Sequence, residues 1–219
     1  TAVGTDLLYA AITKAGGVLV HNRQRNIDWN LTGWLALGSL PAACITLWVL
    51  HAWNPDVHTL NAIIKRGLGF ALMLTALAII FKQQLLNFAH RAAPGWINMP
   101  RSIQVSATVA TGIMLGVLVT LTSIGAGALG TVALFMLYPL MPTTRLVGTE
   151  IAHAVPLTLI AGLGHAGLGN LDWHLLGNLL VGSLPGIYIG SRLSGGVPDK
   201  YLRPFLALML AIVGSKLVM

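Results

Sequence analysis

The residues best suited to chemistry in this sequence lie at a glycine-rich interruption between two apolar segments. Thr122 and Ser123 stand just before Gly125, Ala126 and Gly127. A helix broken there would expose free backbone amides, and a helix N-terminus carries about half a positive charge. The two hydroxyls can also donate hydrogen bonds to an oxyanion. The pattern predicts an anion-binding turn, with close helix packing through small residues as the alternative.

A second candidate is a glycine-threonine-acid motif that occurs twice. Its polar members are Thr5 with Asp6 and Thr149 with Glu150. On one interpretation each threonine caps the N-terminus of a helix and the acid sits in the first turn. On the other, the threonines contact a substrate and the acids face a cavity, where a carboxylate can take up and release a coupling proton.

Lys14 and His153 complete the candidate set. Lys14 lies well inside an apolar segment, where an ammonium is costly unless it reaches water, an acid or a bound anion. It is a candidate substrate-binding residue, and the alternative is a side chain that snorkels to the membrane surface. His153 follows Thr149 by one helical turn. It could line a transport path or serve as a buried structural histidine.

Enzymatic and metal chemistry find no support in the sequence. The histidines and acids form no His-Glu-x-x-His pattern, no paired-aspartate motif and no Gly-x-Ser-x-Gly elbow. Cys44 is the single cysteine, which excludes an internal disulfide and a multi-cysteine metal site. We therefore expect neither an enzyme nor a metal or cofactor. The net charge of +7 comes without a basic nucleic-acid-binding module, so no nucleic-acid partner is expected.

The elements that must position these residues follow from composition. Only 9% of the 219 residues are charged and 55% are hydrophobic, with a mean hydropathy of +0.77, so the surface must face lipid. Inside lipid only helices satisfy their own backbone groups in a single segment, which predicts an all-α, polytopic fold. The apolar segments are 6–20, 29–53, 67–81, 104–121, 126–140, 147–164, 174–190 and 202–218.

The two halves of the chain are related. Residues 3–41 align with 147–185 without a gap, sharing Val-Gly-Thr-acid, Asp-Trp and Gly-Ser-Leu-Pro at matching positions. Apolar composition alone would not align these residue types, so we infer a duplication. It divides the chain into a first repeat at 1–90, a connecting loop at 91–103 and a second repeat at 104–219.

The duplication also predicts an N-terminally incomplete first repeat. The second copy begins near Gln104 with a long apolar stretch that has no counterpart before Thr1. We therefore expect an N-terminally truncated chain.

Charge placement indicates the orientation of the repeats. If every segment crosses the membrane, one side carries most of the basic residues, as the positive-inside rule requires, and the bias disappears if 104–140 crosses only once. The first side would hold Arg23, Arg25, Lys82, Arg91, Arg101, Arg145, Arg192, Lys200 and Arg203, against Lys65, Arg66 and Lys216. Each complete repeat then has an odd number of segments, so the repeats are inverted, a common plan for secondary transporters. Segment 126–140 is short and could instead be re-entrant.

The motifs together resemble a known family. Thr-Ser-Ile-Gly-Ala-Gly-Ala-Leu at 122–129, Val-Gly-Thr-Glu at 147–150, Gly-Ser-Leu-Pro-Gly at 182–186 and the duplication are similar to the TauE/SafE sulfite exporters, also called 4-toluene sulfonate uptake permeases. The resemblance covers nearly the whole chain, although Gly-Ala-Gly-Ala stands where more glycines are usual. It implies a multi-pass permease of the bacterial inner membrane for sulfite, sulfonates or related oxyanions.

These observations lead to one expected function and one alternative. The expected function is a secondary transporter whose partners are a small anion, the lipid bilayer and a coupling proton or cation. The alternative is an anion channel or a permease for an unrelated small solute, because a broken-helix hairpin can also line a pore. Homo-oligomer formation is left open.

Overall fold

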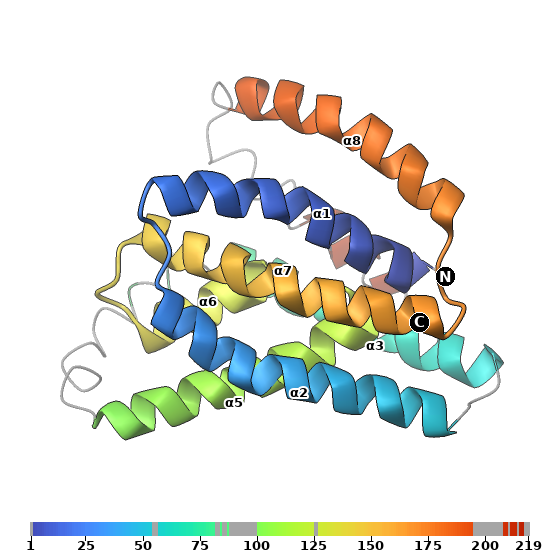
Figure 1. Ribbon diagram of the computed structural model, residues 1–219, viewed down its shortest axis with the longest axis horizontal. Coiled ribbons are helices and arrows are strands. Elements are labelled where there is room, and N and C mark those ends of the chain that lie inside the picture. The colour runs from blue at the N-terminus through green and yellow to red at the C-terminus, as the bar shows by residue number, and fades with distance from the viewer. Residues whose placement is uncertain are drawn as a thin grey trace.

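The computed structural model is built from helices that run side by side (Figure 1). It describes residues 2–53, 57–81, 84, 87, 100–124, 127–194, 208–209, 211–213 and 215–216. In chain order the helices are α1 (Ala2–Arg23), α2 (Trp29–Trp53), α3 (Val57–Ile80), α5 (Arg101–Thr122), α6 (Ala128–Leu137), α7 (Thr143–Gly167) and α8 (Trp173–Ser194). The all-α prediction is confirmed.

The apolar segments predicted the helices well. The range 29–53 coincides with α2, and 104–121 differs from α5 by a few residues. Helix α3 begins at Val57, well before the predicted start at 67. The helix is interrupted between α5 and α6, as the glycines there predicted. The connecting loop 91–103 and the last segment, 202–218, lie largely outside the described residues.

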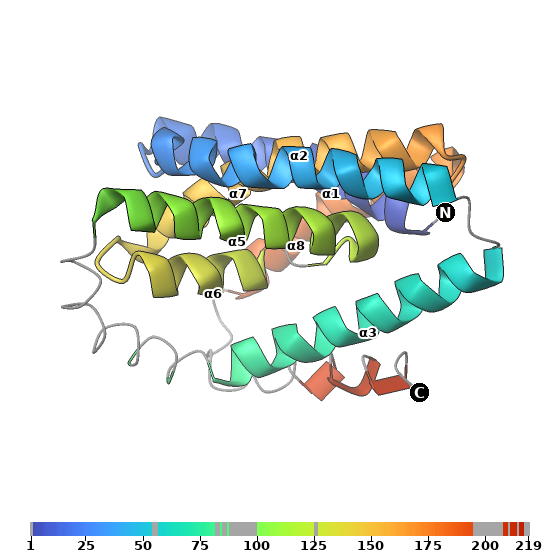
Figure 2. The same cartoon turned by 90° about the horizontal axis from the view of Figure 1, so that it is seen from below.

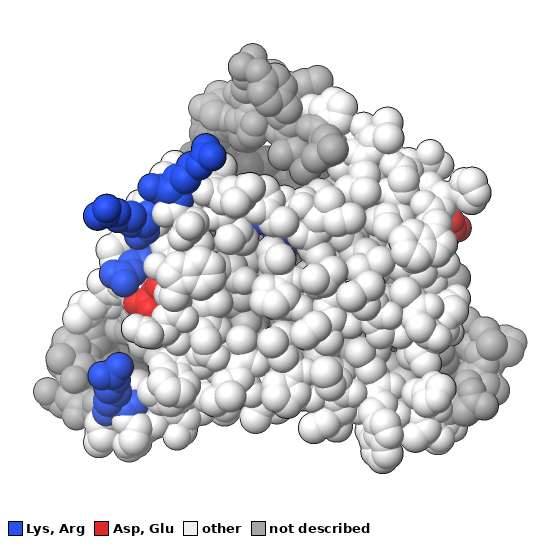
Figure 3. All heavy atoms as spheres, viewed as in Figure 1, with Lys and Arg blue, Asp and Glu red and all other residues white. Residues whose placement is uncertain are grey.

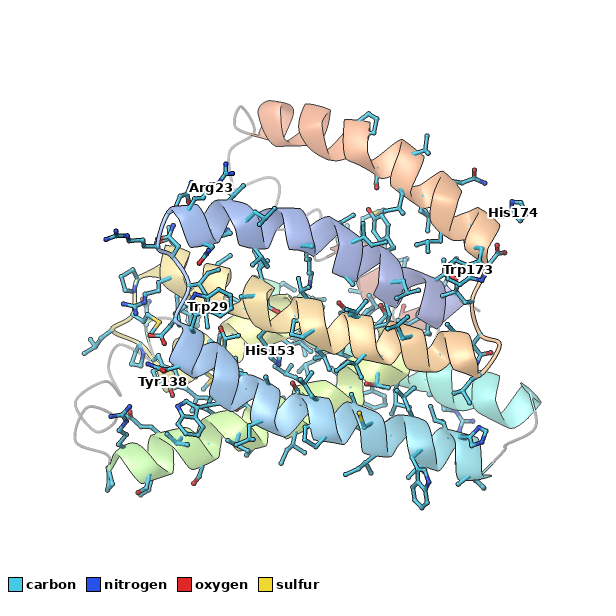
Figure 4. The ribbon with its side chains drawn as sticks, viewed as in Figure 1. Arg23, Trp29, Tyr138, His153, Trp173 and His174 are labelled. Atoms are coloured by element: carbon cyan, nitrogen blue, oxygen red, sulfur yellow. The ribbon has the colours of Figure 1, made fainter. Side chains whose placement is uncertain are left out.

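The duplicated Asp-Trp pairs begin α2 and α8. Asp28 Oδ1 accepts a hydrogen bond from the Leu31 amide at 3.1 Å, and Asp172 Oδ1 accepts one from the Leu175 amide at 2.9 Å. Each carboxylate satisfies an amide that has no partner within the first turn of its helix. Trp29 and Trp173 follow these caps, and they lie at opposite ends of the bundle (Figure 4).

The capping interpretation of the glycine-threonine-acid motifs is wrong. Helix α7 begins at Thr143, directly after Pro142, so Thr149 and Glu150 lie within its second turn. Helix α1 already includes Ala2, so Thr5 and Asp6 are also inside a helix. In each case the helix continues on the N-terminal side of the motif, where the sequence placed a loop, and the threonine hydroxyl accepts a hydrogen bond from another segment.

Helix directions follow from close contacts between backbones. A Cβ on Gly4 would collide with the carbonyl of Asn170, and one on Gly148 would collide with the carbonyl of Asn26. The start of α1 therefore meets the chain just after α7, and the start of α7 meets the chain just after α1. The two helices are antiparallel.

Helix α2 runs parallel to α5 through a glycine-lined contact. A Cβ on Gly38 would collide with the carbonyl of Val109, and Gly112 and Gly116 have equally close contacts with the backbones of Leu35 and Ser39. Small residues of this kind let membrane helices approach closely and gain dispersion energy. Beside this contact, α1, α2, α5 and α7 share an apolar core of Leu7, Ala43, Val119, Leu157 and Ala161.

The chain reverses after α5 and returns along it. Helix α6 has 10 residues, about 15 Å of helix, and a hydrogen bond of 2.7 Å joins Thr108 Oγ1 to Tyr138 Oη near its end. Residues 138–142 complete the return without helix, and α7 starts at the end of the bundle where α5 also starts. Residues 104–140 therefore run along the bundle in both directions, although α6 is shorter than a membrane-spanning helix. Two membrane crossings by this segment stay a prediction.

The outer surface is apolar and the interior contains many of the polar groups. Trp48, Phe70 and Val181 are among the most exposed side chains, whereas Ser39, Thr149 and others are buried. Among the described residues, α1, α2, α5 and α7 are each long and apolar enough to cross a bilayer. Such a distribution suits lipid rather than water.

Basic side chains gather at one end of the molecule (Figure 3). Arg23 ends α1, Arg25 follows it, Arg101 begins α5 and Arg145 lies in the first turn of α7. These four arginines share a side, as predicted. Lys82, Arg91, Lys200 and Arg203 lie outside the described residues, as do the side chains of Lys65 and Arg192.

Two helices lie at the edge of the bundle. Helix α3 diverges from α5 and α6 (Figure 2), and α8 runs along α1 on the far side from α2 (Figure 1). The central helices α1, α2, α5, α6 and α7 therefore enclose the buried polar residues.

We expect Gly38→Ala to destabilise the protein, because its methyl group would push α2 away from the Val109 carbonyl. Overpacking of this kind costs about 1–3 kcal/mol. Thermal unfolding of the purified protein in detergent measures the effect. Gly33→Ala is the matched control, since a Cβ there meets nothing within 4 Å. Equal melting temperatures for the two variants would contradict the proposed packing.

Candidate functional site

A buried histidine and a buried serine meet between α2 and α7. His153 Nε2 lies 2.7 Å from Ser39 Oγ, and neither side chain has exposed surface. His153 lies inside the bundle, where the two helices face each other (Figure 4). The backbone of Ser39 is packed against Gly116 of α5, which fixes the position of its hydroxyl. The other ring nitrogen, His153 Nδ1, is buried with no hydrogen-bond partner among the described residues.

Glu150 lies one turn before His153 on the same face of α7. It is 2% exposed, and its Oε1 has no hydrogen-bond partner within the described part of the chain. Gly130 of α6 leaves room for this carboxyl group, since a Cβ on Gly130 would lie 3.2 Å from Oε1. Lys14 of α1 acts electrostatically on both Glu150 and His153. Lys14 is half-buried, whereas Ser39, Glu150 and His153 are buried. We call these four side chains, which come from α1, α2 and α7, the central cluster.

The predicted anion-binding turn lies where α5 ends. Ser123 adopts a left-handed conformation with φ of 61°, and its hydroxyl donates a 2.6 Å hydrogen bond to Asp6 Oδ2 of α1. Thr122 Oγ1 donates to the Leu118 carbonyl at 2.7 Å and accepts from the Ile124 amide at 3.1 Å. Both hydroxyls are therefore engaged within the protein, and an anion would have to displace one of these bonds.

The glycines of this turn are only partly described. Gly125 lies outside the described residues. Gly127 immediately precedes α6, and a Cβ on it would meet nothing within 4 Å. The free amides and the dipole at the N-terminus of α6 favour negative charge there.

The two motif threonines brace the helices at opposite ends of the α1–α7 pair. Thr149 Oγ1 accepts a 2.9 Å hydrogen bond from the Asp28 amide and donates to the Arg145 carbonyl at 2.7 Å. Thr5 Oγ1 accepts a 3.0 Å hydrogen bond from the Asp172 amide. Thr149 of α7 thus holds the turn that follows α1, and Thr5 of α1 holds the turn that follows α7.

An ion pair strengthens one of these braces. Arg145 Nη2 donates to Asp28 Oδ2 at 2.9 Å, at the end of the bundle where the arginines gather. At the other end, position 1 is the counterpart of Arg145 in the aligned repeat, and it is a threonine.

The predicted site residues thus fall into three places. Lys14, Glu150 and His153 approach one another, Asp6 meets Ser123 at the α5–α6 turn, and the motif threonines hold loops. Sequence reasoning missed Ser39 and Gly130 as members of the central cluster. The duplicated Gly-Ser-Leu-Pro motif was a signal for Ser39, but only the packing of α2 on α7 identifies its partner. In the described part of the chain, no group of three or more histidine, cysteine or acidic side chains could hold a metal ion.

A valine at position 149 tests the brace. Thr149→Val keeps the shape of the side chain but leaves the Asp28 amide without its acceptor, so we expect a loss of about 1–3 kcal/mol in unfolding free energy. Thr149→Ser retains the oxygen and should stay close to the wild type. Thermal unfolding in detergent gives both values, and a valine variant as stable as the serine variant would rule out the brace.

Comparison with known proteins agrees with this architecture. The family model described as "Sulfite exporter TauE/SafE" matches residues 1–217. The "Probable membrane transporter protein YjnA" of Bacillus subtilis (strain 168) is 39% identical over 218 residues, which cover 99% of this chain and 84% of that protein. The "Probable membrane transporter protein YdhB" of the same organism is 28% identical over 223 residues, covering 100% and 84%.

No solved structure matches the chain. The family match nevertheless spans nearly all of the chain, and the similarity to the first relative covers almost the whole of this chain. This multi-pass membrane protein therefore belongs to the TauE/SafE sulfite exporter family, which is a family of transporters and not of enzymes.

Proposed function

We propose that this protein is a secondary transporter that moves small sulfur-containing anions, such as sulfite, sulfonates or related oxyanions, across the bacterial cell membrane. The observation that carries the proposal is the central cluster of Lys14, Ser39, Glu150 and His153. Ionisable side chains inside a membrane-spanning bundle are costly and mark transport paths. The family name supplies the sulfur chemistry.

The chemistry of the cluster supports an anionic substrate. The Lys14 ammonium provides positive charge, while the Ser39–His153 pair offers hydrogen-bonding groups in an interior with no exposed surface. In such a low-dielectric place, charge-assisted hydrogen bonds to an oxyanion are strong. Thr5 and Thr149 lie at the two ends of the same helix pair and could contact the anion only after their braces open.

The α5–α6 turn offers a second contact for the anion on its path. Thr122, Ser123 and Gly127 lie there, beside the N-terminus of α6, and Gly125 belongs to the same sequence motif. Displacing the Ser123 hydroxyl from Asp6 would free a donor for the anion and also change the surroundings of that carboxylate. Asp6 and Glu150 are the two candidates for coupling transport to a proton or cation.

The arrangement of the halves supports inverted repeats at 1–90 and 104–219. Thr5 and Thr149 are equivalent in the alignment, and each binds the amide of the aspartate that begins a helix of the other repeat. The two Asp-Trp pairs lie at opposite ends of the bundle. By the positive-inside rule, the end with Arg23, Arg25, Arg101 and Arg145 faces the cytoplasm.

Counterflow in proteoliposomes tests the function. Vesicles that contain the protein are loaded with unlabelled sulfite and diluted into trace labelled sulfite, with sulfonates, sulfate and chloride as competitors. A carrier produces transient, saturable accumulation that one class of sulfur anion inhibits. Fast flux without saturation would indicate a channel, and no flux of sulfur anions by folded protein would exclude the proposed substrate class.

Lys14→Ala should reduce counterflow far more than it reduces stability, because it removes the positive charge near Glu150 and His153. We expect roughly a tenfold or greater loss, corresponding to at least about 1.4 kcal/mol of binding energy. Lys14→Arg keeps the charge and serves as the control, with melting temperatures measured for both. Ser123→Ala should have a similar but milder effect. Flux at the wild-type level in Lys14→Ala would remove this residue from the site.

A further inference from the structure

Two buried polar atoms of the central cluster have no hydrogen-bond partner among the residues that the structure describes. They are Glu150 Oε1 and His153 Nδ1, which belong to side chains that are 2% and 0% exposed. Because the residues are three positions apart on α7, both side chains lie on one face of the helix. Buried polar groups without partners are rare and call for a physical reason.

The bond to Ser39 determines what His153 presents to this space. Gly38 and Gly116 hold the Ser39 backbone tightly against α5, and its hydroxyl lies 2.7 Å from Nε2. If the Ser39 hydroxyl only accepted a hydrogen bond from His153, its own proton would be buried without an acceptor. We therefore assign Ser39 as the donor and His153 Nε2 as the acceptor of this bond. Neutral imidazole then carries its proton on Nδ1, which becomes a hydrogen-bond donor on the side chain one turn after Glu150.

A carboxyl group beside this donor restricts what can bind. The imidazole N–H and the Lys14 ammonium attract an oxyanion, but an ionised Glu150 would repel it in this low-dielectric interior. A proton between Glu150 Oε1 and an oxygen of the anion removes the repulsion and replaces it with a hydrogen bond. The same assembly results from a neutral acid with sulfite or from a carboxylate with hydrogensulfite.

We propose that each anion binds together with one proton held between Glu150 and an anion oxygen, and that Ser39 positions His153 for this contact. The inference deepens the proposed function and rests on it: transport is then proton–anion symport. The proton enters with the anion from one side and leaves with it on the other, which leaves Glu150 ready for the next cycle.

Few other charges can take part. Helix α6 has no charged or titratable residue, α5 has only Arg101 at its start, and α2 has only Cys44 and His51 in its second half. Helix α1 contributes Lys14, besides Tyr9 and Asp6 nearer its start and His21 and Arg23 in its last turn. His21 packs against Gly148, closer to the end of the bundle than Glu150. In α7, Arg145 pairs with Asp28 at one end, and His165 binds the Thr120 carbonyl at the other.

Asp6 is a less suitable proton site than Glu150, although the two are equivalent in the aligned repeats. Asp6 is exposed, and its Oδ2 already accepts the Ser123 hydroxyl at 2.6 Å. The Asp6 carboxylate thus has both a donor and contact with the surface, whereas Glu150 is buried with an oxygen that has no hydrogen-bond partner among the described residues.

The test compares Glu150→Gln with the wild type in proteoliposomes at zero membrane potential. The glutamine amide can donate permanently to the anion, so exchange of labelled for unlabelled sulfite should persist. Accumulation driven by a pH gradient should be lost. For the wild type we expect about tenfold accumulation of labelled methanesulfonate, a constant monoanion, for each unit of pH gradient at one proton per anion.

Ser39→Ala separates positioning from folding. It should raise the KM for sulfite roughly tenfold, a change that matches the net free energy of one hydrogen bond. The ratio of transported protons to anions should stay at the wild-type value. Ser183→Ala is its control, because Ser183 occupies the same place in the second Gly-Ser-Leu-Pro motif and donates to the Leu180 carbonyl. An unchanged KM in Ser39→Ala would overturn the positioning role.

A pH-sensitive dye inside wild-type vesicles gives a direct second measurement. Anion uptake should acidify the lumen, and exchange without any proton movement would overturn symport while leaving the transporter function intact. Gradient-driven accumulation by Glu150→Gln at the wild-type level would also overturn it. Absence of wild-type counterflow for both sulfite and methanesulfonate would instead overturn the proposed function and this inference with it.

Discussion

The close contact between α2 and α5 is the constraint on which the rest of the interior depends. Gly38, Gly112 and Gly116 let the two backbones meet, so the chain at Ser39 is held without a side chain between the helices. Helix α7 then packs on α2 with His153 against the Ser39 hydroxyl. In lipid, dispersion and interhelical hydrogen bonds replace the hydrophobic effect between helices, so a contact of this kind largely determines their arrangement.

The duplicated motif has acquired different surroundings in its two copies. Both threonines bind the amide of an aspartate that begins a helix, so this structural role is shared. The acids that follow differ, because Glu150 is covered by α6 at Gly130 whereas Asp6 is exposed and binds Ser123. The same local sequence pattern thus provides a buried carboxyl group in one half and an exposed one in the other.

The braces also suggest how the two ends of the bundle differ in strength. The turn after α1 is held to α7 by Thr149 and by the ion pair between Arg145 and Asp28. The turn after α7 is held to α1 by Thr5, whose brace has no arginine counterpart at the aligned position. In an alternating-access carrier the two ends must open in turn, and opening the first end would break an additional charged contact.

Much of this protein was determined by local sequence. Hydropathy and length specified the helices, with 29–53 matching α2, and the aspartate before each tryptophan specified where α2 and α8 begin. These features depend on neighbouring residues alone. The N-cap assignment for Thr149 failed because residues 143–147 continue the helix toward Pro142, which local capping preferences did not reveal.

The composition of the candidate site was decided only by the tertiary structure. Lys14, Glu150 and His153 were recognisable one by one as polar residues in apolar segments, but not as neighbours. Gly130 carried no signal of its own, since a glycine in a membrane helix is usually a packing residue, and the duplicated motif that contains Ser39 did not reveal its partner. Which of them face one another depends on the rotation and separation of α1, α2, α6 and α7, and these follow from contacts between residues far apart in the chain.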